Sequence, residues 1–107
     1  MHLIDCFQIS IHHPCLPGHF PGRPIVPGVV LLEQIETTLK KQFANWEITE
    51  IAHVKFLQPV LPEERIELHL NSSKLESHGS LVFQLIHSQT QARAASGKLT
   101  LLELNKR

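Results

Sequence analysis

Three residues in the first third of the chain have the types and spacing needed to move a proton beside a carbonyl group. His19 belongs to the side-chain type that takes up and releases a proton near neutral pH. Gly28 stands where a helix is predicted to begin, so its amide would be an unpaired donor able to stabilise an oxyanion. Glu33, five residues later, could hold a hydroxyl group or act as an acid. Together they favour removal of a proton alpha to a carbonyl and expulsion of a beta hydroxyl, chemistry that requires no metal or nucleotide cofactor.

Plainer interpretations of the same residues stay open. A segment rich in proline and glycine ahead of a helix is often only a connection, and a histidine on it is often a surface residue. Glu33 could equally be a structural carboxylate that accepts a hydrogen bond from a backbone amide.

Two other chemistries are disfavoured. A nucleophile pair of Cys15 and His19 lacks a third orienting group, and Pro17 excludes helical spacing between them. Zinc bound by the same two residues with His12 and His13 would lack the paired ligand spacings of structural zinc sites. The other histidines are expected on solvated faces, at positions 2, 53, 69, 78 and 87.

The segment 12–27 is expected to be a stiff loop. Between residues 14 and 28 lie five of the seven prolines and three of the five glycines, at positions 14, 17, 21, 24 and 27 and at positions 18, 22 and 28. Proline fixes φ and removes an amide donor, so neither a helix nor a central strand can form there. We therefore predict a rigid frame that positions His19 and Gly28.

A helix is predicted from Pro27, because proline suits a first turn and apolar residues recur as far as Phe43. Its first turn is apolar on all sides, which predicts an enclosed N-terminal half and an apolar neighbourhood for Glu33. The helix should become exposed near Lys40 and Lys41.

Alternation of apolar and polar residues predicts one strand before this helix and four after it. The expected strands are 3–11, 47–60, 65–71, 80–87 and 92–104, with turns at 62–64, 72–79 and 88–91. One long helix with antiparallel strands indicates an α+β domain of two layers, in which a curved sheet wraps the helix and the last four strands form a meander. The 107 residues, 1–107, are expected to form a single domain.

The composition argues against several partners. Ten Lys and Arg balance ten Asp and Glu, so bulk charge does not favour nucleic acid. No apolar run reaches the roughly 18 residues that span a bilayer, so no membrane is expected. Two cysteines and no recognisable secretory leader predict a reduced, cytoplasmic protein.

The loop and helix together contain the motif His19-Phe20-Pro21-Gly22-x-Pro24-x-x-Pro27-Gly28-x-x-x-x-Glu33. It resembles the signature of the FabZ-type beta-hydroxyacyl-acyl carrier protein dehydratases, which have the hot-dog fold. The stretch 51–62 resembles a later strand of that family, in which an aromatic residue precedes a Pro-Val-x-Pro turn. The resemblance covers residues 10–70 and implies reversible dehydration of a 3-hydroxyacyl thioester to the trans-2-enoyl thioester, in fatty acid or related polyene lipid biosynthesis.

The resemblance also implies roles for individual residues. His19 and Glu33 would be the catalytic pair, the Gly28 amide would polarise the thioester carbonyl, and the Ile25 carbonyl would orient the imidazole. Substrate binding would further involve two motif residues, Phe20 and Pro27. No cofactor is implied.

The partners implied are an acyl carrier protein and a second copy of the chain. In a homodimer, which could build larger assemblies, His19 of one subunit would share a site with Glu33 of the other. The acidic carrier would dock on a basic patch built on Arg23, with contributions from Lys40, Lys41, Lys55 or Arg65.

Several departures from the family pattern carry expectations of their own. An N-terminal segment usual in the family does not precede the first strand, so the tunnel wall or the acyl-chain selectivity should differ. Glu63 stands where many relatives have glycine, and Glu33 rather than aspartate favours dehydration without isomerisation. A hot-dog thioesterase and a non-catalytic acyl-binding protein remain the alternative functions.

Overall fold

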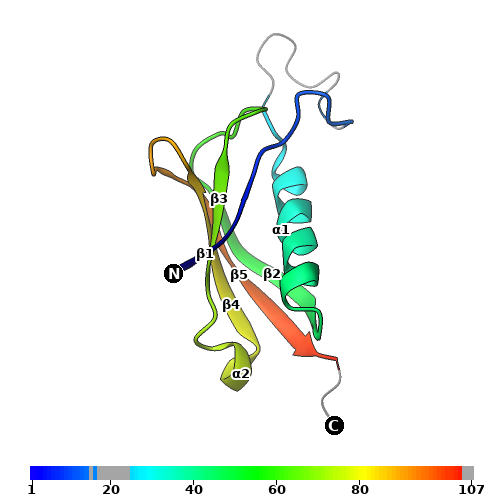
Figure 1. Cartoon of the computed structure of the whole chain (residues 1–107). Coiled ribbons are helices and arrows are strands. Elements are labelled where there is room, and N and C mark those ends of the chain that lie inside the picture. The colour runs from blue at the N-terminus through cyan, green and yellow to red at the C-terminus, as the bar shows by residue number, and fades with distance from the viewer. Residues whose placement is uncertain (15, 17–24, 105–107) are drawn as a thin grey trace.

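The computed structural model describes residues 1–14, 16 and 25–104 of the chain (Figure 1). Five strands and two helices follow one another along it. They are β1 (His2–Phe7), α1 (Gly28–Gln42), β2 (Trp46–Phe56), β3 (Ile66–Asn71), α2 (Leu75–His78), β4 (Ser80–His87) and β5 (Arg93–Glu103). No helix in these described ranges is long and apolar enough to cross a membrane.

The strands form one antiparallel sheet in the order β1-β3-β4-β5-β2, which confirms the predicted α+β class. Strands β3, β4 and β5 are a meander, but the prediction that β2 belongs to it was wrong. β2 pairs with β5 at one edge of the sheet, and residues 57–65 carry the chain across to β3. That crossing segment becomes part of the candidate site described below.

Helix α1 lies along one face of the sheet, and a single stripe of its residues is buried there (Figure 1). The apolar members of this stripe are Val30, Leu31, Ile35 and Leu39. They join alternate residues of β3, β4 and β5 in the core, where Leu68, Phe83 and Leu99 have no exposed surface. Burial of each such apolar side chain contributes about 1.5 to 3 kcal/mol to folding.

The C-terminal half of α1 is tied to β1 by two hydrogen bonds. The Thr38 hydroxyl donates to the Asp5 carboxylate over 2.8 Å, and the Gln42 side-chain amide donates to the Ile4 carbonyl over 2.8 Å. The helix is therefore fixed both to the sheet face and to an edge strand.

The opposite side of α1 is uncovered in the single chain, so the predicted enclosure of its N-terminal half was wrong. Val29 is 58% exposed and Glu33 is also exposed. Apolar residues on all sides of a first turn indicate burial, but the sheet of one chain can cover only one side of a helix.

Element boundaries also differ from those predicted. β1 ends at Phe7 and β2 at Phe56, both earlier than expected. Beyond β2 the Leu57 and Gln58 amides both donate to the Ala94 carbonyl, so the regular ladder stops there. The predicted turn 72–79 contains the short helix α2, which ends at Gly79 in the left-handed conformation. A four-residue helix leaves no periodicity to detect.

Candidate active site

The N-terminus of α1 presents backbone amides that the helix itself cannot pair. Pro27 is the extended N-cap residue, and the first helical hydrogen bond runs from the Val30 amide to the Pro27 carbonyl over 3.0 Å. The amides of Gly28 and Val29 precede that bond, so they have no acceptor within the helix. They lie at the positive end of the helix dipole, which favours a negative or developing negative charge.

The crossing segment packs directly against this helix terminus. The Val26 amide donates to the Val60 carbonyl over 2.8 Å, and both side chains are buried. Residues 25–28, Leu31 and residues 56–60 line a cavity of about 360 Å³. Three of the predicted site residues, Ile25, Pro27 and Gly28, thus share one largely apolar cavity.

Glycine at position 28 leaves room for the close approach of an aromatic ring. A Cβ atom on Gly28 would lie 2.6 Å from Cζ of Phe56. The Phe56 ring is 52% exposed, so it could move aside, but only by leaving its place over the helix terminus. Glycine therefore keeps the terminus open beside a hydrophobic wall.

Glu33 is not brought to this cavity by its own chain. Five residues separate it from Gly28, which corresponds to about 7.5 Å along the axis and about 140° around it. Its side chain is exposed and lines neither cavity described here, while its backbone carbonyl accepts a hydrogen bond from the Thr37 hydroxyl over 2.9 Å. Glu33 belongs to the uncovered side of α1.

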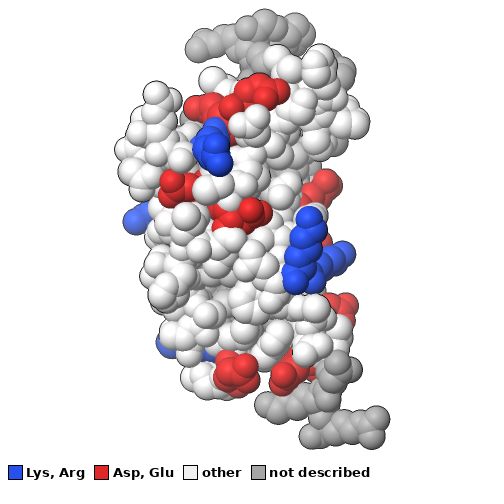
Figure 2. Space-filling model, viewed as in Figure 1, with Lys and Arg blue, Asp and Glu red and all other residues white. Residues whose placement is uncertain are grey.

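Several predicted residues lie outside the part of the chain that the structure describes, namely Cys15, His19, Phe20 and Arg23. Lys40 and Lys41 occupy the last turn of α1, and basic side chains are visible over that half of the helix (Figure 2). They lie about 18 Å or more along the axis from Gly28. Lys55 directly precedes Phe56 and is much nearer to the cavity in sequence and in the fold.

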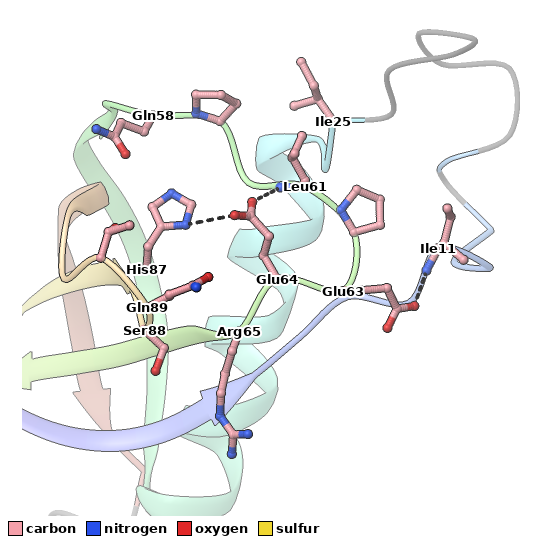
Figure 3. Close-up of a pocket in the computed structure, with 13 residues that line it drawn as sticks. Ile11, Ile25, Gln58, Leu61, Glu63, Glu64, Arg65, His87, Ser88 and Gln89 are labelled. Atoms are coloured by element: carbon pink, nitrogen blue, oxygen red, sulfur yellow. Dashed lines mark hydrogen bonds and ion pairs between the residues drawn. The ribbon is translucent and has the colours of Figure 1, made fainter.

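A second cavity of about 1330 Å³ adjoins the first and shares Ile25, Gln58 and Pro59 with it. In Figure 3 the side chains of Glu64 and His87 point toward each other across it. Glu64 accepts a hydrogen bond from the Leu61 amide over 2.6 Å through one oxygen, and its other oxygen lies 3.7 Å from Nδ1 of His87.

His87 was predicted on a solvated face, and that prediction was wrong, since only 7% of it is exposed. Alternation along β4 could have revealed the burial, because position 87 is in phase with Leu81, Phe83 and Leu85. Sequence reasoning also did not identify Phe56 as the ring against Gly28, or Glu63 and Glu64 as hydrogen-bonding residues of the crossing segment.

On β3, His69 is also paired rather than simply solvated. Its Nε2 lies 2.9 Å from the Glu67 carboxylate, which accepts further hydrogen bonds from the Ser88 hydroxyl over 3.0 Å and the Gln91 amide over 3.2 Å. The hydrogen bond from His69, followed by that from Ser88, lowers the pKa of Glu67 below its ordinary value. This group fixes the turn between β4 and β5, and of its members only Ser88 lines a cavity, the larger of the two.

The five-stranded antiparallel sheet packs on one long helix, and the N-terminus of that helix opens onto an apolar cavity. This arrangement is the hot-dog fold. Its known examples are diverse in sequence. A hexameric thioesterase from Yersinia pestis has a TM-score of 0.72 at 15% identity, over 98% of this chain and 88% of that chain. Likeness at that identity shows the fold alone.

The relatives by sequence are dehydratases. The family model of ApeI-like proteins, described as ApeI dehydratase, matches residues 3–98. The 3-hydroxyacyl-[acyl-carrier-protein] dehydratase FabZ of Mannheimia succiniciproducens is 36% identical over 86% of this chain and 67% of its own length. The dehydratase heterocomplex ApeI:P from Xenorhabdus doucetiae has a TM-score of 0.75 at 25% identity, over 92% of this chain and 84% of that chain. The chain therefore belongs to the ApeI-like dehydratase family, and it is a lyase that removes water.

Proposed function

We propose that the chain removes water reversibly from a 3-hydroxyacyl thioester carried by acyl carrier protein, giving the trans-2-enoyl thioester. His19 takes the proton from C2 while the Gly28 amide and the α1 dipole stabilise the negative charge on the thioester oxygen. The C2–C3 double bond forms as the C3–O bond breaks, and Glu33 supplies the proton with which the hydroxyl leaves as water. Transfer of a proton from His19 to Glu33, directly or through solvent, restores both groups.

The observation that carries this proposal is the position of Gly28. Its amide lies at the positive helix end, without a helical acceptor, and beside the apolar cavity that it lines with Ile25 and Pro27. An apolar cavity suits an acyl chain, and an amide at its edge suits the oxygen of a thioester. The dehydratase names of the relatives supply the substrate class.

The active site is proposed to be shared between two copies of the chain. Glu33 faces away from the Gly28 cavity of its own chain, at about 140° around α1, which supports a site in which Glu33 comes from the second chain. Burial of the uncovered side of α1 by that second copy would also make α1 the central helix wrapped by sheet. Val29, 58% exposed on the same side, is an apolar residue that such contact would cover.

The acyl carrier is proposed to dock on basic residues around Arg23. Among the other candidates, Lys55 and Arg65 flank the cavities, whereas Lys40 and Lys41 lie at the far end of α1. The reaction is placed in the cytoplasm, as the cysteine content predicts, and in fatty acid or polyene lipid biosynthesis. Glu33 rather than aspartate favours dehydration without isomerisation.

Hydration of an enoyl thioester, the reverse reaction, tests the proposal. Loss of the enoyl absorbance is followed with the wild type, His19→Ala and the matched control His12→Ala. We expect His19→Ala to lower turnover by about a hundredfold or more, since the group that delivers the proton to C2 in this direction is lost, while His12→Ala keeps wild-type turnover. Turnover of His19→Ala close to that of the wild type would disprove the role of His19.

The two alternative functions give different products. A thioesterase releases free thiol, which a thiol reagent detects, whereas dehydration and hydration leave the thioester intact. A non-catalytic acyl-binding protein would return the substrate unchanged but bound. We expect hydrated thioester and no free thiol.

A further inference from the structure

Glu63, in the crossing segment between β2 and β3, joins the start of the predicted catalytic loop to the body of the protein. Its carboxylate accepts a hydrogen bond from the Ile11 amide over 2.9 Å and a second from the Gln8 side-chain amide over 3.2 Å. Its own amide donates to the Ile9 carbonyl over 2.8 Å. In Figure 3 the Glu63 side chain points toward Ile11 and away from the Glu64–His87 pair.

These bonds connect residues more than fifty positions apart in the sequence, and together they fix one short stretch of chain. Hydrogen bonds to an ionised carboxylate are stronger than those between neutral groups, so Glu63 is well suited to this role. Ile9, in the middle of the stretch, is buried with only 6% of its surface exposed. The chain is therefore anchored at Gln8–Ile11, immediately before the segment that contains His19.

The same crossing segment anchors the other end of that loop. The Val60 carbonyl accepts the Val26 amide over 2.8 Å, just before α1 begins. Residues 60–63 thus hold the chain at residues 9–11 and again at residue 26. Both ends of the loop that carries His19 are fixed to one short element.

The backbone at Glu63 indicates that this arrangement has a cost in strain. Its φ is +68°, a left-handed backbone conformation that residues other than glycine and asparagine seldom adopt. Glycine would relieve the strain but would remove the carboxylate and two of the three bonds. Strained residues that persist are often found where function requires them.

We propose that Glu63 is a positioning residue for the reaction: it fixes the start of the catalytic loop and so sets the placement of His19. This inference rests on the proposed function. Glu63 touches no reacting atom, so its loss should reduce turnover more than substrate binding, and the fold should persist.

The test compares Glu63→Gly with Glu63→Gln in the full chain. Glu63→Gly relieves the backbone strain and removes the clamp, so we expect unchanged or higher resistance to urea, a kcat lowered about tenfold and a KM within threefold of the wild type. Glu63→Gln keeps an oxygen for the Ile11 amide and should retain a kcat within threefold of the wild type. Hydrogen exchange of the Ile11 amide should accelerate in Glu63→Gly and stay slow in Glu63→Gln.

Gln91→Gly is the matched control for strain, since Gln91 has a φ of +62° in the turn between β4 and β5. It should leave kcat unchanged. A folded Glu63→Gly protein with wild-type kcat, or with an Ile11 amide as protected as before, would overturn the proposal.

A double variant separates this proposal from the proposed function. Glu63→Gly added to His19→Ala should cause no further loss, because the clamp acts through His19. Losses that multiply overturn the positioning role while leaving His19 as the base. A fully active His19→Ala protein instead overturns the proposed function, and with it the link from Glu63 to His19.

Discussion

The two sides of helix α1 have different tasks, although they belong to the same fifteen residues. One side buries Ile35 and its neighbours against the sheet, with 1% of Ile35 exposed. The other side leaves Val29 and Glu33 open. Burial on the first side holds the fold of a single chain, whereas the second side acquires its proposed role only when another copy covers it. Stability and activity should therefore respond to different residues of one helix.

Ile35→Ala should give the largest effect, on the buried side. Removing three methylene-sized groups from a fully packed position leaves a cavity, so the free energy of unfolding should fall by about 2 to 5 kcal/mol. Urea denaturation measures this, with Thr37→Ala on the exposed side as the control. A loss below about 1 kcal/mol would mean that this stripe does not carry the core.

Glu33→Gln should give the opposite pattern, on the exposed side. Turnover should fall about a hundredfold because the carboxyl group that exchanges a proton with the C3 oxygen is lost, while the free energy of unfolding changes by less than about 0.5 kcal/mol. Kinetics of enoyl thioester hydration and urea denaturation of the same samples test both expectations. A large fall in the free energy of unfolding together with the loss of turnover would contradict the division between the two sides of α1.

The shared site makes a further prediction from the same variant. Equal amounts of the Glu33→Gln and His19→Ala proteins are unfolded together and refolded as a mixture. Half of the dimers then contain one chain of each variant. Each mixed dimer has one intact site of two, so activity should return to about a quarter of the wild-type value. A mixture as inactive as its components would place His19 and Glu33 of one chain in the same site.

Gly28→Ala should give a smaller effect, at the helix end where the two sides meet. The added Cβ would displace the Phe56 ring, so kcat should fall about tenfold as the amide and its apolar wall separate. The double variant Gly28→Ala/Phe56→Ala removes the colliding ring and should recover part of the loss. If the double variant is worse than Gly28→Ala alone, the clash is not the cause.

The two lysines at the C-terminal end of α1 should have a smaller effect again, on the binding of the carrier. Replacing Lys40 and Lys41 with alanine should raise KM for a carrier-bound substrate by less than about threefold, because they lie far from the Gly28 cavity. Lys55→Ala should raise it more, and added salt should erase the difference. A stronger effect from Lys40 and Lys41 would show that the carrier docks along the helix instead.

The smallest effect should come from a region remote from α1, the Glu67 carboxylate on β3. Its pKa is lower in the folded protein than in the unfolded chain, so the ionised group stabilises the fold above the ordinary pKa of glutamate. That stabilisation is lost as the pH falls through the lowered value. The urea midpoints of wild type and Glu67→Gln should differ at pH 7 and converge in acid, with kcat unchanged at neutral pH.

Much of the fold could be predicted from the sequence, because alternation and helical periodicity are local. The strands and α1 appear near the expected ranges, and α1 begins directly after Pro27 as its chemistry predicts. Which strands pair could not be predicted in the same way. Nothing in the alternation of β2 distinguishes β5 from β3 as its neighbour.

The candidate site could be proposed from the sequence where one short motif carries it. Ile25, Pro27 and Gly28, close together in the motif, line one cavity, and their roles there stay predictions. The exposure of Glu33 in the single chain was not predictable, because periodicity indicates an apolar surface but not whether the same chain covers it. The role of Glu63 was also hidden, since it depends on contacts with residues more than fifty positions earlier. The φ of +68° gives the physical reason why glycine would suit that position.

The position of β1 at the edge of the sheet affects how the protein loses activity when it is heated. β1 is hydrogen-bonded within the sheet to β3 alone, and these two strands come from opposite halves of the chain. Partial opening at this edge would release the stretch before the catalytic loop while the other four strands keep their ladders. Inactivation should therefore precede global unfolding, so a melting temperature would overstate the range in which the enzyme works.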